Sequence, residues 1–108
     1  MTFLAIDAQK NLFTLQKGQL QLEQTFIMSR ANYITKQMGY RQAELNDTDT
    51  DPEEDYVYME LHREEEYLET RQDSLDSQIS LIENEISSLK NLVTSNIKSS
   101  CALNLIGG

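Results

Sequence analysis

The sequence has no tryptophan, and it contains only one cysteine, one proline, one histidine and four glycines among its 108 residues. Such a low content of proline and glycine argues against a turn-rich sheet protein and against an enzyme built on loops. The single cysteine, Cys101, has no partner for an internal disulfide. We therefore expect one domain, residues 1–108, of mostly helical structure, synthesised in a reducing cytoplasm.

Positive charge is also scarce. Nine Lys and Arg residues stand against eighteen Asp and Glu residues, and the formal net charge is -9 at pH 7. Nucleic acids and anionic membrane surfaces both attract basic faces, so neither is an expected partner. Residues 46–76 hold thirteen acids and two arginines, a net charge of -11, whereas residues 1–45 hold five bases and three acids, a net charge of +2. This asymmetry suits an antiparallel hairpin or head-to-tail stacking of subunits, and a solvated acidic face is the simpler alternative.

Long apolar runs are missing as well. No stretch approaches the roughly 18 apolar residues of a membrane span. The first ten residues, MTFLAIDAQK, lack the positive start and the long apolar stretch of a secretory signal. We expect a cytoplasmic protein without a membrane span, with leaderless export to the outside of the cell as the alternative.

The stretch NDTDTDPEED, residues 46–55, is the one sharp break in an otherwise helical pattern. Asp47, Asp49 and Asp51 alternate as the first acids of a calcium loop do. Pro52 stands where such a loop needs glycine, and Tyr58 stands where it needs a bidentate glutamate. We therefore expect no metal site here.

The same stretch is typical of a corner between two helices. Asp51 can cap the second helix, Pro52 can occupy its first position, and Glu53 and Glu54 can face the positive end of its dipole. We predict a first helix over about residues 2–45, a corner over 46–51 and a second helix from about 52 to 100. Asp51, Pro52 and Glu54 are the predicted capping residues.

The second predicted helix has the clearest periodicity. Its apolar residues step by four and three in turn, which is a coiled-coil seam: Leu75, Ile79, Ile82, Ile86, Leu89 and Val93. The tail over residues 101–108 is apolar, and we predict that three of its side chains contact other subunits: Leu103, Leu105 and Ile106.

The first predicted helix has two apolar stripes, and a helix with two such stripes needs two partners. The more aliphatic stripe is assigned to the seam with the second helix and contains Ile6, Phe13, Leu20, Ile27 and Ile34, joined by Phe3, Ala31, Met38 and Leu45. The other is richer in aromatics, which are favoured at interfaces. Its predicted subunit contacts are Leu12, Leu15, Leu22, Phe26, Tyr33 and Tyr40.

The sequence contains no recognisable set of catalytic residues. His62 is the only histidine, and a di-iron Glu-x-x-His pair would need an acid at position 59, which is Met59. No phosphate loop or Ser-His-Asp set can be placed. We expect no enzyme, no catalytic residue, no cofactor and no bound metal, and we expect His62 to lie at the surface among acids.

Two long helices joined at Asp51-Pro52 make the chain resemble the needle subunits of type III secretion systems. That resemblance implies a helical tube of exported bacterial subunits, with an export apparatus or its chaperone as further partners. The exported hairpins of the WXG100 class are also similar in architecture. They carry Trp-x-Gly at the corner, and this chain has no tryptophan.

The predicted fold class is therefore all-α: an antiparallel hairpin of two long, coiled-coil-like helices that assembles into a helical oligomer or filament. The expected function is that of a structural, self-assembling filament or tube subunit whose partners are copies of itself. The alternative is a small coiled-coil adaptor or chaperone that acts as a closed dimer or tetramer. A carboxylate-lined metal enzyme is a third class, disfavoured by the shortage of ligands.

Overall fold

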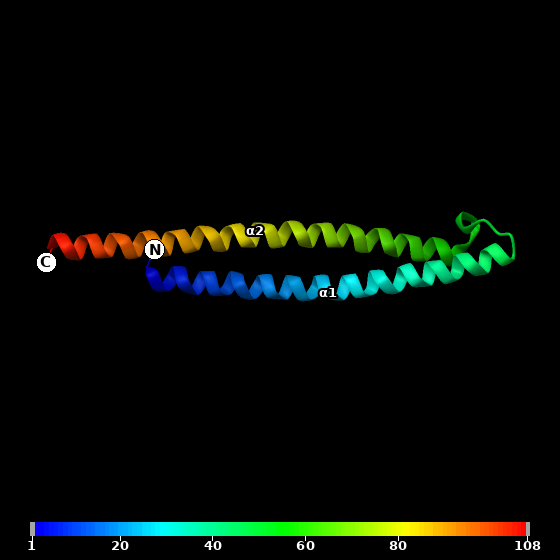
Figure 1. The fold of residues 1–108 in the computed structure, drawn as a ribbon, viewed down its shortest axis with the longest axis horizontal. Helices are drawn as coiled ribbons and strands as arrows, with labels where there is room; N and C mark the ends of the chain where they lie inside the picture. Colours follow the sequence, from blue (N-terminus) through cyan, green and yellow to red (C-terminus); the bar gives the residue numbers. More distant parts are fainter. Residues whose placement is uncertain (1, 108) are drawn as a thin grey trace. The chain divides into compact units, whose positions relative to one another are not determined.

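The chain forms a hairpin of two long helices. The computed structural model describes the backbone of residues 2–107 and the side chains of residues 2–95 and 97. Helix α1 spans Phe3–Asp47, the short 3-10 helix η1 spans Pro52–Glu54, and α2 spans Tyr56–Gly107 (Figure 1). No strand occurs among the described residues. The predicted all-α two-helix hairpin is confirmed.

Contacts divide this hairpin into two compact units. The corner unit is Leu22–Asp76, with the end of α1, η1 and the beginning of α2. The terminal unit contains the beginning of α1, up to Gln21, and α2 from Ser77 onward. Each unit pairs one segment of α1 with one segment of α2, and each has its own buried side chains.

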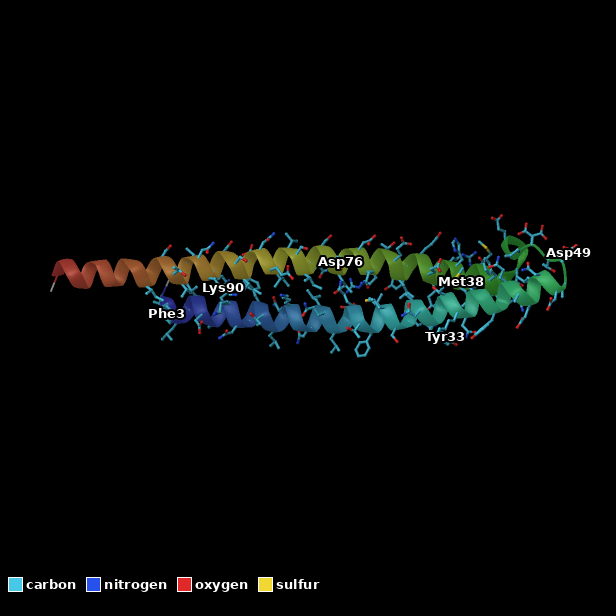
Figure 2. All side chains as sticks on the ribbon, viewed as in Figure 1. Phe3, Tyr33, Met38, Asp49, Asp76 and Lys90 are labelled. Carbon is cyan, nitrogen blue, oxygen red and sulfur yellow. The ribbon has the colours of Figure 1, made fainter. Side chains whose placement is uncertain are left out.

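The corner unit has a core of aliphatic side chains. Ile34 and Leu75 are fully buried, and Ile34 forms a cluster with Met38 and Leu68. Four half-buried residues pack against this cluster: Ile27, Ala31, Tyr58 and Leu61. Figure 2 labels Met38, which comes from the side of α1 that faces α2 in this unit. The aliphatic stripe of α1 is therefore the seam with α2 here, as the periodicity predicts.

The terminal unit also buries side chains from both helices. Its buried side chains are Ile6 from α1 and Ile79 and Leu89 from α2. Further aliphatic and aromatic positions of the predicted seams are half-buried: Phe13, Leu20, Ile82, Ile86 and Val93. The Lys17 ammonium lies 3.4 Å from a Glu83 carboxylate oxygen across the helix pair. Both predicted heptad patterns thus mark buried or half-buried positions in this unit too, except at Phe3, which was predicted to join the seam and is 46% exposed.

The corner corrects the predicted start of the second helix. Asp51 caps the 3-10 helix η1, where its side chain accepts a hydrogen bond of 3.0 Å from the Glu53 amide, and Pro52 is the first residue of η1. Helix α2 begins four residues later than predicted, at Tyr56. Asp55 precedes it with extended backbone, and its carboxylate accepts a hydrogen bond of 2.8 Å from the Tyr58 amide. Asp55 is therefore the N-cap of α2.

Asp55 takes this role because α1 holds it in place. The Arg41 guanidinium donates two hydrogen bonds to its carboxylate, from Nε at 2.8 Å and from Nη2 at 2.7 Å. A bidentate pair of this kind fixes both position and orientation. Asp49, in the connection before η1, has a φ of 54°, in the left-handed region that aspartate tolerates better than most residues.

The other end of α2 also differs from the prediction. The helix continues to Gly107, whereas the sequence pattern ended it at about residue 100 and left an apolar tail. Residues 101–106, CALNLI, contain no proline or glycine to stop a helix. The side chains of Leu103, Leu105 and Ile106 lie outside the described residues, so their predicted subunit contacts stay a prediction.

The Arg41 pair makes stability depend on pH in a defined window. Hydrogen bonds from Arg41, and then from the Tyr58 amide, lower the pKa of Asp55 from its ordinary 3.8 to about 2. Between these values the unfolded chain binds a proton that the folded chain does not, so stability falls as the pH falls from about 4 to about 2. We expect wild type to lose more stability in this window than Asp55→Asn, measured by urea unfolding followed by circular dichroism. Parallel pH profiles for the two proteins would contradict the pairing.

Candidate functional site

The corner unit carries a row of exposed apolar side chains on α1. Leu22, Phe26, Tyr33 and Tyr40, here called the outer stripe, are 56%, 65%, 50% and 64% exposed. Their spacing of four, seven and seven residues keeps them on one side of the helix. Figure 2 shows Tyr33 on the side of α1 away from α2. These are four of the six α1 residues predicted to contact other subunits.

The remaining two predicted residues lie in the terminal unit. Leu12 and Leu15 are 53% and 60% exposed, three residues apart on α1. A spacing of three places them on neighbouring turns of one face. The six α1 side chains of the predicted interface are therefore all accessible, and whether another chain covers them stays a prediction.

The outer stripe has one cation within it. Lys36 lies three residues after Tyr33 and four before Tyr40, so it belongs to the same strip of the helix surface. It is exposed, and it forms no ion pair with any residue whose side chain is described. By composition alone, Lys36 is only one of the five bases in residues 1–45. The signal that could have placed it in the stripe is its spacing of three and four from the two tyrosines.

Arg30 borders the outer stripe but is already engaged within the hairpin. Its guanidinium carbon lies 5.1 Å from the centre of the Tyr33 ring. It also donates hydrogen bonds of 2.7 and 3.2 Å to the two carboxylate oxygens of Glu64 on α2. These hydrogen bonds raise the pKa of Arg30 above its ordinary value. Arg30 thus contacts both Tyr33 and Glu64, whereas Lys36 has no ion-pair partner among the described side chains.

The corner holds a second feature, an open cavity of about 500 Å³. It is lined by Asp51, Pro52, Glu53, Tyr58, Met59 and His62. His62 lies among acids of its own helix, with Nε2 3.1 Å from a Glu66 oxygen and Nδ1 3.8 Å from a Glu65 oxygen. This agrees with the predicted position of His62 at the surface among carboxylates. Among the described side chains, no three His, Cys, Asp or Glu residues are grouped as metal ligands.

Comparisons with protein families, with characterised proteins and with solved structures gave no match. Within the described residues, no helix combines the length and the apolar character needed to cross a membrane.

Proposed function

We propose that this protein is a structural, self-assembling subunit that joins copies of itself through the exposed face of α1. The observation that carries this proposal is the outer stripe: α1 already buries one apolar stripe against α2, and it exposes a second. Large apolar side chains are gathered there in a row, and such patches on soluble proteins mark interaction surfaces. Burial of each aromatic ring removes about 150–250 Å² from water with few rotatable bonds to fix.

The polar composition around the stripe supports contact with protein. Exposed positions beside it carry amide and hydroxyl side chains, among them Thr25, Ser29 and Asn32. Uncharged polar groups are less costly to cover than charges, because fewer strong interactions with water are lost. A covered face in an assembly is the environment that fits this composition. Helical filaments or tubes are the form of assembly that we propose, with a closed dimer or tetramer as the alternative architecture.

The proposed assembly predicts that Phe26→Ser with Tyr33→Ser yields a helical protein that associates far more weakly than wild type. Truncating two interfacial aromatics removes more than 1.4 kcal/mol of association free energy, so the concentration needed for assembly should rise more than about tenfold. Sedimentation velocity over a concentration series, with circular dichroism for helicity, measures this. Wild type should associate as its concentration rises.

A matched control replaces exposed amide side chains away from the stripe and from the positions beside it, with Gln42→Ser and Asn84→Ser together. This variant should assemble like wild type. A wild type that stays a helical monomer at its highest soluble concentration would refute the proposed function. Electron microscopy of the wild type then separates filaments from closed oligomers, and discrete small particles would favour an adaptor or chaperone architecture.

A further inference from the structure

We propose that the outer stripe of one copy docks into an acidic groove on the corner unit of a second copy. This inference rests on the proposed self-assembly. It identifies the surface of the second copy that the outer stripe contacts. The groove encloses about 330 Å³, and its lining is mostly apolar. Residues from both helices line it: Ile27, Met28 and Ala31 from α1, and Glu65, Leu68, Glu69, Gln72 and Asp73 from α2.

The rim of the groove has negative charge that the hairpin itself does not neutralise. Glu69 and Asp73 are exposed, four residues apart on α2, and neither has an ion pair or hydrogen bond among the described side chains. Two other acids of the corner unit, Glu23 and Glu64, are paired with arginines of the opposite helix. Arg71 bonds Glu23 at 2.7 Å, and Arg30 bonds Glu64 at 2.7 Å. The groove therefore presents apolar surface with unmatched acids, which suits an apolar partner that carries a cation.

The outer stripe has the complementary character. It is apolar and aromatic, and Lys36 lies between Tyr33 and Tyr40 without an ion-pair partner among the described residues. Each copy of the chain thus carries an apolar surface with a free cation and a groove with free acids. Complementary charge fixes register and disfavours wrong partners, so a second copy is the occupant that these surfaces favour.

The spacing of side chains sets the register of this contact. Lys36 and Tyr40 are one helical turn apart, so the register that places the Lys36 ammonium at Glu69 also lays the Tyr40 ring against the apolar lining of the groove.

This contact joins two different surfaces, and that decides the kind of assembly. An interface between unlike surfaces is heterologous, and repetition of it gives rings or open helical filaments. An interface of two outer stripes would instead be self-complementary and would stop at a dimer. The groove therefore gives a physical reason for the filament or tube.

Charge exchange between the two surfaces tests the proposal on the full chain. Lys36→Glu and Glu69→Lys should each raise the concentration needed for assembly by at least about tenfold, because each places like charges in contact. An equal mixture of the two variants should assemble near the wild-type concentration, since the stripe of each variant fits the groove of the other. Sedimentation and light scattering measure all three samples, and circular dichroism confirms that each is helical.

Glu85→Lys is the matched control, because it makes the same charge change at an exposed position of α2 outside the groove. It should assemble like wild type. Assembly of Glu69→Lys at the wild-type concentration would overturn the docking of a second copy in the groove while the proposed self-assembly stands. Failure of the mixture to recover assembly would overturn the pairing of Lys36 with Glu69. A wild type that does not associate would refute the proposed function and this inference together.

Discussion

Ile34→Asp should unfold the corner unit. Ile34 is fully buried, with 0% of its surface accessible to water, and it packs in the cluster with Met38 and Leu68. The substitution removes a large apolar side chain and places a carboxylate where no partner is available. Loss of the side chain alone costs about 2–5 kcal/mol, and the unpaired charge adds to this. We expect a decrease in unfolding free energy of more than about 4 kcal/mol, measured by urea unfolding with helical ellipticity as the signal.

The control for this variant is Asn32→Asp, two residues earlier on the same helix. Asn32 is exposed, and the change keeps the size of the side chain. Its effect should stay within about 0.5 kcal/mol, as for most surface substitutions. Equal damage from both substitutions would mean that the repulsion of added negative charge, and not the loss of packing, limits the stability of this acidic chain.

Asp55→Ala should destabilise the hairpin more than any other single change at the corner. The Asp55 side chain is 13% exposed, caps α2 through the Tyr58 amide and accepts both hydrogen bonds from Arg41. The alanine variant loses the cap and leaves the Arg41 guanidinium with only the exposed Glu44 carboxylate as a partner. Thermal unfolding followed by circular dichroism should show a melting temperature lower by several degrees.

Asp51→Ala and Asp47→Ala are the comparisons for this result. Asp51 caps only the three residues of η1, and Asp47 ends α1 at an exposed position. Both changes should lower the melting temperature less than Asp55→Ala. If Asp51→Ala proved the most damaging of the three, the second helix would start at Pro52, as its sequence suggests, and the assignment of Asp55 as the cap would be wrong.

The sequence by itself determined the hairpin and its two seams. Apolar residues at steps of three and four lie on one face of a helix whatever the rest of the chain does, so this spacing marks Ile34 and Leu75 as core positions. The same reasoning separated the aromatic stripe of α1 from the aliphatic one, and Phe26 and Tyr33 are indeed exposed. Single-helix geometry was sufficient for all of these assignments.

Tertiary structure alone decided the features that depend on two helices at once. Asp51 and Asp55 are both reasonable caps by sequence, and Asp55 caps α2 with the help of Arg41, fourteen residues earlier in the chain. The groove also depends on which flank of α1 meets which flank of α2. Periodicity fixes the buried face of each helix. That Glu69 and Asp73 line the same groove as Met28 follows from the rotation and register of the two helices relative to each other. Those are set by the packing of Ile27, Ala31 and Leu68 between the helices, which no single-helix pattern encodes.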